Sequence, residues 1–114
     1  VLETLFSSPD TRLITQAKVE KISASDAAKY IGKKEMGCAE VYEVKDLSNV
    51  SFLDAGNSYP NNPLTIVVFA RDRANFKNGL EIYDHKNICV TGTIKEYKGK
   101  PEIIINGPGE ISVE

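Results

Sequence analysis

Apolar and polar residues alternate along most of the chain from Glu35 onward, a pattern typical of half-buried β-strands. Clusters of turn-forming residues separate the strand-like segments, and the richest of them lies at 56–63. The predicted strands are 35–46, 50–55, 64–70, 88–94 and 101–106. The segment 64–70 is almost wholly apolar, which indicates a strand covered on both faces. Gly92, in the middle of the fourth strand, is typical of a bulge or a sharp bend.

Two short segments have the features of helices. Ser23 or Ser25 can accept a hydrogen bond from a free backbone N–H, and Gly32 stands where a left-handed residue ends a helix. Apolar residues between them recur at spacings of three and four and form one apolar face: Ala27, Tyr30 and Ile31. The segment 71–79 is short and polar, and we expect a small helix or turn that Gly79 closes.

The predicted elements follow the order strand–strand–strand–helix–strand–strand. This is the order of a five-stranded Greek-key barrel of the oligonucleotide/oligosaccharide-binding (OB) type, whereas an up-and-down barrel would need no helix at that point. We therefore predict an all-β OB-fold domain at 23–114, with a short helix between strands 3 and 4 and a short N-terminal helix. Residues 1–22 are interpreted as an N-terminal arm or linker.

Charge and composition narrow the functional classes. The formal net charge is −2 and the pI is about 5.5, whereas dedicated nucleic-acid binders are usually basic on at least one face. A basic surface on this chain would therefore have to be local. No apolar run approaches the length that spans a bilayer. Because the chain begins at Val1, we expect that a signal peptide or lipid anchor has been removed, and we favour an extracytoplasmic location over a cytoplasmic one.

The residues that could carry redox, metal or catalytic chemistry are few. Cys38 and Cys89 cannot supply the four ligands of a structural zinc site. Strand alternation would turn Cys38 inward with Met36 and Cys89 outward, so we expect no disulfide unless a bulge reverses one of them. His85 is the only histidine, and neither a Ser–His–acid set nor a phosphate-binding Gly-rich loop is present. We expect a non-enzymatic protein with no cofactor or metal.

Several short stretches carry a combination of residues found together in one group of proteins. They are AAKYIGK at 27–33, FL at 52–53, Gly56, YP at 59–60, VVF at 67–69, RDR at 71–73, Phe76, ICVTGTI at 88–94, YKGKP at 97–101 and Ile103. In these stretches the chain resembles bacterial single-domain OB-fold proteins of the tRNA-anticodon-binding-like group, over about residues 23 to 113. Members are described mostly as nucleic-acid-binding proteins, and some carry lipoprotein signals. Glu40 stands where many members have glycine, a departure that could remove a bend in the first strand.

An OB barrel binds single strands across its second and third strands, between the loop after strand 1 and the loop joining strands 4 and 5. Such a site needs aromatic side chains that stack on bases and cations that contact phosphates. Ten residues are candidates by type and predicted position: Tyr42, Lys45, Phe52, Tyr59, Arg71, Arg73, Lys95, Tyr97, Lys98 and Lys100. The stretch 97–100 offers a ring and two cations within one hairpin, and the alternative, which the sequence alone favours slightly, is a solvated hairpin tip.

These residues favour single-stranded DNA or RNA as the ligand. Acidic neighbours would oppose phosphate, so the electrostatic part of binding should be weak and easily lost to salt. The acidic neighbours are Glu40, Glu43, Asp46, Asp54 and Glu96. The alternative is an extracytoplasmic accessory domain that binds a protein or a small ligand in place of nucleic acid.

Overall fold

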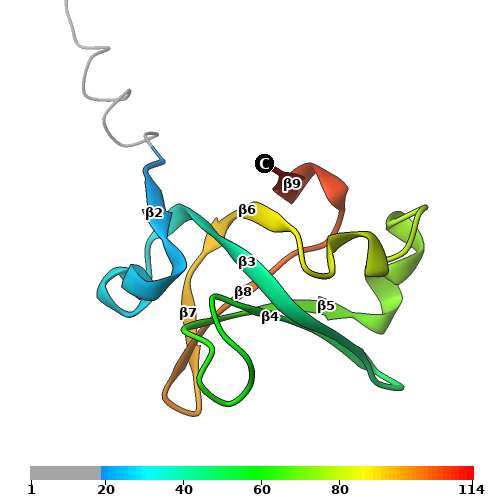
Figure 1. Cartoon of the computed structure of the whole chain (residues 1–114), viewed down its shortest axis with the longest axis horizontal. Helices are drawn as coiled ribbons and strands as arrows, with labels where there is room; N and C mark the ends of the chain where they lie inside the picture. The colour runs from blue at the N-terminus through cyan, green and yellow to red at the C-terminus, as the bar shows by residue number, and fades with distance from the viewer. Residues whose placement is uncertain (1–18) are drawn as a thin grey trace, which may run out of the picture.

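The computed structural model describes residues 19–114 and shows a small barrel organised around one long strand, β3 (Lys34–Asp46) (Figure 1). The other strands are β2 (Lys21–Ser23), β4 (Val50–Ala55), β5 (Leu64–Phe69), β6 (Asn87–Thr93), β7 (Lys95–Tyr97), β8 (Lys100–Ile104) and β9 (Ile111–Val113). Four short 3-10 helices connect them: η1 (Ala24–Tyr30), η2 (Ala70–Asn75), η3 (Glu81–Tyr83) and η4 (Pro108–Glu110). Every described helix is too short or too polar to cross a membrane.

The barrel closes because β6 and β7 run on as one bent strand, whose first part pairs with β3 and whose last part pairs with β8. The strands are ordered β7-β8-β5-β4-β3-β6-β9, and only Ile94 separates β6 from β7 in the sequence. β6 therefore pairs with β3 while β7 pairs with β8. β5 and β8 pair in parallel, whereas β3, β4 and β5 form an antiparallel meander. This confirms the predicted all-β, five-stranded OB barrel.

Both ends of the described chain add to the barrel. β2 pairs in parallel with β3, and β9 pairs antiparallel with β6. The predicted arm at 1–22 thus contributes part of β2, while residues 1–18 lie outside the described part of the chain.

The predicted helices are present as 3-10 turns. Ser23 caps η1 by accepting a hydrogen bond from the backbone N–H of Ser25 at 3.3 Å. Gly32 adopts the left-handed conformation expected of a residue that ends a helix, with φ of +90°. The connection between β5 and β6 contains two separate turns, η2 and η3, and the helix predicted at 71–79 corresponds to the first of them.

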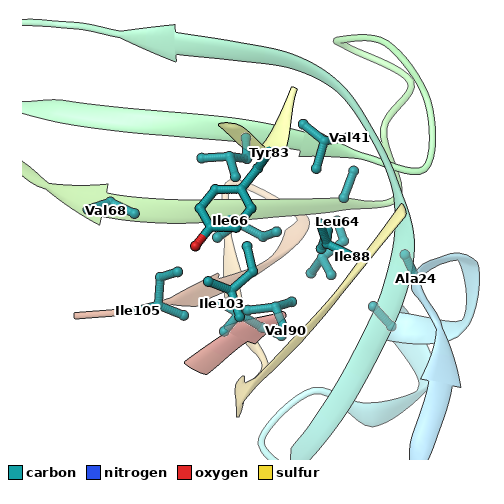
Figure 2. Packing of buried hydrophobic residues seen from close by; sticks show 14 of the residues in the cluster. Ala24, Val41, Leu64, Ile66, Val68, Tyr83, Ile88, Val90, Ile103 and Ile105 are labelled. Atoms are coloured by element: carbon teal, nitrogen blue, oxygen red, sulfur yellow. The ribbon is translucent and has the colours of Figure 1, made fainter. Parts of the chain in front are cut away.

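The core fills the barrel with aliphatic side chains from every long strand (Figure 2). Tyr83 of η3 and Phe76, which follows η2, pack into the same cluster and are buried. Gly92 faces this core, because a Cβ at that position would lie 2.6 Å from Cγ2 of Ile103. The pairing of β6 with β3 has no register shift at Gly92, so this glycine permits close packing and does not form a bulge.

A register shift in β3 provides the bend that Glu40 was expected to remove. Val41 pairs with Ala55 of β4, whereas Glu43 pairs with Asp54, so Tyr42 is an extra residue on β3. An extra residue of this kind bends its strand and strengthens the local twist. The bend therefore lies just after Glu40 and needs no glycine there.

Cys38 and Cys89 form a disulfide, so the prediction that they stay apart was wrong. The two residues are direct partners in the β3–β6 register, with Cα atoms 4.1 Å apart. The inward positions of β3 include Gly37 and Val41, which are buried, and Cys38 lies on the opposite face with Met36. The sequence pattern had placed Met36 and Cys38 inside. Cys89 does point away from the core side of β6, as predicted, and this brings the two sulfurs together.

Candidate nucleic-acid interface

A groove of about 740 Å³ crosses the outer face of β4 and β5. It is bordered by the β3–β4 turn, by the loop between β4 and β5, and by the β7–β8 hairpin. Its lining residues are Lys45, Leu47, Asn49, Val50, Phe52, Asp54, Tyr59, Thr65, Val67, Phe69, Tyr97, Lys98, Lys100, Pro101 and Glu102. The even positions of β4 and the odd positions of β5 line it, because their neighbours along each strand point into the barrel.

The strand register divides the groove floor into an apolar part and a polar part. Val50 pairs with Phe69, and Phe52 pairs with Val67, so two adjacent rows are apolar. The next row contains Asp54, which pairs with Thr65. Thr65 in turn pairs with Glu102 of β8. A flat apolar ring can therefore rest on one part of the floor while its polar edge meets the other.

Two exposed tyrosines stand at the edges of the groove. Tyr59, from the β4–β5 loop, is 62% exposed, and Tyr97, at the end of β7, is 59% exposed. The Nζ atoms of Lys45 and Lys100 lie 4.1 and 5.3 Å from the Tyr59 ring centroid. Nζ of Lys98 lies 5.4 Å from the Tyr97 centroid. Each exposed ring therefore has at least one ammonium group within cation–π range.

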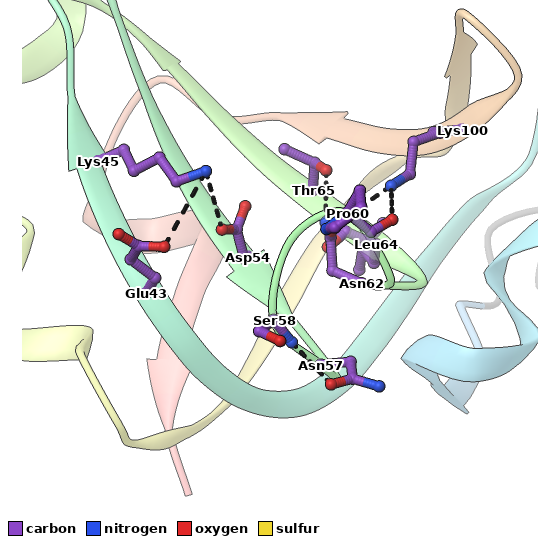
Figure 3. A network of polar contacts seen from close by, with 10 residues as sticks. All are labelled: Glu43, Lys45, Asp54, Asn57, Ser58, Pro60, Asn62, Leu64, Thr65 and Lys100. Carbon is purple, nitrogen blue, oxygen red and sulfur yellow. Dashed lines mark hydrogen bonds and ion pairs between the residues drawn. The ribbon is translucent and has the colours of Figure 1, made fainter.

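Side-chain hydrogen bonds hold the loop that carries Tyr59 (Figure 3). Buried Asn62 donates from Nδ2 to the carbonyl of Leu64 at 3.0 Å and to Oγ1 of Thr65 at 2.8 Å. The ammonium of Lys100 donates to the carbonyl of Pro60, and it lies 3.4 Å from Oδ1 of Asn62. The loop is thereby tied to both β5 and β8, which keeps Tyr59 beside the groove.

Asp54 is a buried carboxylate in the polar part of the floor. It is 2% exposed, and its Oδ2 lies 3.5 Å from Nζ of Lys45 (Figure 3). The same Nζ atom lies 4.0 Å from Oε1 of Glu43. Burial raises the pKa of Asp54, and the charge of Lys45 opposes that rise. Burial also raises the pKa of Glu102, against the charge of Lys95. The groove thus combines three lysines with two carboxylates that are poorly solvated.

The structure brings six of the ten candidate residues into this groove. They are Lys45, Phe52, Tyr59, Tyr97, Lys98 and Lys100. Arg71 lies at its border, with its guanidinium carbon 5.0 Å from the centroid of the Phe69 ring. Lys95 is the register partner of Glu102 on the exposed strand β7.

Two candidates lie elsewhere. Arg73 donates from Nε to Oγ of Ser51 at 2.9 Å and from Nη2 to the carbonyl of Leu47, so it braces the β3–β4 turn. Tyr42 lines a separate hollow of about 270 Å³ beside η1. Its place on the register shift carries it away from the groove.

The groove also contains residues that the sequence did not single out as candidates. Most belong to the floor: Val50, Asp54, Thr65, Val67, Phe69 and Glu102. Alternation with Phe52 could have identified Val50 and Asp54, because all three share one face of β4. The almost wholly apolar segment of β5 gave no such signal, because one threonine among apolar residues does not distinguish the two faces of a strand.

Comparisons with known proteins support the fold and go no further. No protein-family model matches the chain, and no curated protein matches its sequence. One solved structure similar to it is a chain described as an aspartyl-tRNA synthetase from Leishmania major Friedlin, with a TM-score of 0.58 and 10% identity over 85% of this chain and 21% of that one. Another is aspartyl tRNA synthetase from Entamoeba histolytica, with a TM-score of 0.58 and 13% identity over 95% of this chain and 24% of that one. This chain therefore spans less than a quarter of either synthetase, and at these identities the similarity shows an OB-type fold alone.

Proposed function

We propose that this chain is a non-enzymatic module that binds single-stranded DNA or RNA in the groove on β4 and β5. The observation that carries the proposal is the placement of two exposed rings, Tyr59 and Tyr97, at the edges of one groove whose floor includes Phe52 and Phe69. Stacking on an aromatic side chain contributes roughly 1–3 kcal/mol per base, so two such contacts would supply about 2–6 kcal/mol of the roughly 8 kcal/mol that micromolar binding requires. Contacts with Phe52, Phe69 and the lysines of the groove would supply the rest. The groove also lies on the face where OB barrels bind single strands.

The electrostatic contribution to this binding should be small. Lys45, Lys98 and Lys100 are the lysines in the groove, and Asp54 and Glu102 offset part of their charge. Three phosphate contacts to a single strand would give a log–log dependence of affinity on salt with a slope no steeper than about −2. Stacking would therefore contribute more of the affinity than charge does.

Fluorescence anisotropy with a short labelled oligonucleotide at low salt tests the proposal. Micromolar binding is expected, and Tyr97→Ala should weaken it by about five-fold or more, the equivalent of at least about 1 kcal/mol. Tyr42→Ala is the matched control, because Tyr42 is 40% exposed but lies outside the groove. Failure of the wild-type protein to bind, or an equal loss in both variants, would refute the proposed site.

The disulfide favours a second candidate function. Disulfides form and persist mainly outside the reducing cytoplasm, and we propose an extracytoplasmic location on the strength of the Cys38–Cys89 bond. In such a compartment the apolar floor of the same groove could hold a protein segment or a small ligand. Identification of what co-purifies with the protein from its native cells distinguishes the two candidate functions. Co-purification of a defined protein partner, together with a 260/280 nm absorbance ratio typical of protein without nucleic acid, would support the second candidate function.

A further inference from the structure

The polar part of the groove floor would favour some bases over others. We propose, on the basis of the proposed function, that Asp54 makes the groove select bases with an exocyclic amino group, and in particular cytosine over thymine or uracil. Nothing in the stacking residues alone would produce this preference, since every base has a face on which an aromatic ring can stack.

The polar row presents two carboxylate acceptors to the groove. Asp54, Thr65 and Glu102 are successive partners across β4, β5 and β8. Asp54 and Glu102 are carboxylates that accept when ionised, whereas Thr65, whose Oγ1 accepts from Asn62 at 2.8 Å, keeps its hydroxyl hydrogen as a donor. This row borders the apolar part of the floor formed by Phe52 and its partner Val67. A base stacked there would turn its edge toward acceptors.

Asp54 has a carboxylate oxygen that can still accept a hydrogen bond. Its Oδ2 is buried and accepts no hydrogen bond from any residue in the described part of the chain. Buried acceptors are almost always hydrogen-bonded, and an orphaned one calls for an explanation. Lys45 forms an ion pair with Asp54, but the 3.5 Å between its Nζ and Oδ2 is long for a hydrogen bond, so the contact with this oxygen is weak. The ammonium stands at the end of a flexible side chain, so it can move to a phosphate when a strand binds, which leaves Oδ2 open to a donor on the base.

The pyrimidine bases differ in the hydrogen-bonding group that they would present to Asp54. Cytosine carries an N4 amino donor where thymine and uracil carry the O4 acceptor, and Asp or Glu accepting from N4 is the usual contact. In a single strand this edge is free to be recognised. O4 beside Asp54 would place two acceptors together and leave both unpaired, which is strongly disfavoured. Uracil has nearly the shape of cytosine, and thymine adds only the C5 methyl group. The preference would therefore come from Asp54 lying beside the group at C4 and not beside N3, which carries a hydrogen in thymine and uracil.

Anisotropy titrations of oligo(dC) and oligo(dT) of equal length at pH 7.5 test the inference. Wild-type protein should bind oligo(dC) about tenfold more tightly. Asp54→Asn should lose that preference without losing affinity for oligo(dT), because the amide can donate to O4 and Lys45 is released toward phosphate. Comparing the preference of the variant with that of the wild type cancels differences in stacking between the two oligonucleotides. Glu96→Gln is the control for removal of one negative charge, since Glu96 lies on β7 next to the groove but does not line it.

The outcomes separate the two proposals. Equal binding of both oligonucleotides by wild-type protein, or a preference that persists in Asp54→Asn, would overturn the role of Asp54 and leave the nucleic-acid proposal standing. A loss of preference in Glu96→Gln as large as in Asp54→Asn would also overturn it, because general charge would then be the cause. Failure to bind either oligonucleotide at low salt would overturn the proposed function, and this inference with it.

Discussion

The ammonium of Lys45 lies 4.1 Å from the centroid of the Tyr59 ring and 3.5 Å from a carboxylate oxygen of Asp54. One side chain of β3 therefore connects an exposed ring on the β4–β5 loop with a buried acid on β4. The arrangement compensates the charge of Asp54 in the unbound protein and holds a cation beside the ring. The Lys45–Asp54 ion pair therefore affects both the stability of the barrel and the charge of the groove.

Removal of Lys45 should destabilise the protein through Asp54. Lys45→Met leaves a buried carboxylate without its counter-ion, which should lower the free energy of unfolding by about 1–3 kcal/mol. In the double variant with Asp54→Asn, most of this loss should be regained, because the buried charge is gone. Urea denaturation of the wild type, both single variants and the double variant gives the coupling energy. Additive effects would show that the pair is not coupled.

The raised pKa of Asp54 predicts a pH dependence of stability. A carboxyl whose pKa is higher in the folded state than its ordinary value of 3.8 binds protons more readily when folded, so stability falls as pH rises from 3.8 through the folded pKa. Asp54→Asn removes this contribution. The variant should therefore gain stability relative to the wild type as pH increases over that window and keep the gain at neutral pH.

Parallel denaturation curves of the two proteins at several pH values measure this difference. Other acidic groups, including Glu102, are common to both proteins and cancel. A difference that stays constant across the pH range, or that changes in the opposite direction, would contradict the proposed effect of burial on Asp54.

Loss of the disulfide should reduce stability but leave the groove intact. The bond links residues 51 positions apart, and the loop-entropy estimate for that length is about 4 kcal/mol. Cys38→Ser with Cys89→Ser should therefore lower the free energy of unfolding by several kcal/mol. Oligonucleotide affinity of the protein that remains folded should be unchanged, because the bond joins β3 to β6 and does not line the groove. A double variant as stable as the wild type would contradict this account.

The sequence predicted the barrel because its strands are regular and its turns are marked. β4 was predicted with the bounds it has, and β5 differs by one residue at its end. The hairpin at 97–100 and the position of Tyr59 followed from turn-forming residues at the expected places in the order of strands. Six groove residues could thus be found without coordinates.

The inner face of β3 could not be predicted, for a physical reason. Its inward positions include Glu35 and Gly37, neither of which contributes to an apolar pattern. Glu35 is buried because Oε1 accepts a hydrogen bond from the backbone N–H of Glu20 at 2.9 Å, a partner outside the strand. Met36 and Cys38 then gave a false apolar alternation. This reversed the face of Cys38 and hid the disulfide.

Long-range partners also decided the roles of charged residues. Arg73 was a candidate for phosphate contact by its type and position, but it donates a hydrogen bond to Ser51, 22 positions earlier in the chain. Asp54 looked like one of several surface acids, but it is buried under the ion pair with Lys45. Local sequence contains neither contact, so the type of residue suggested a site without giving its role.

The central claim is that the groove on β4 and β5 is the binding surface for a single strand. The most direct test is a two-dimensional ¹H–¹⁵N NMR titration of the labelled protein with a short unlabelled oligonucleotide at low salt. The account predicts that the amide shifts that change most belong to β4, β5, the β4–β5 loop and the β7–β8 hairpin, with Tyr59 and Tyr97 among them. The largest changes on β6, β9 and η1, or no change at millimolar oligonucleotide, would contradict it.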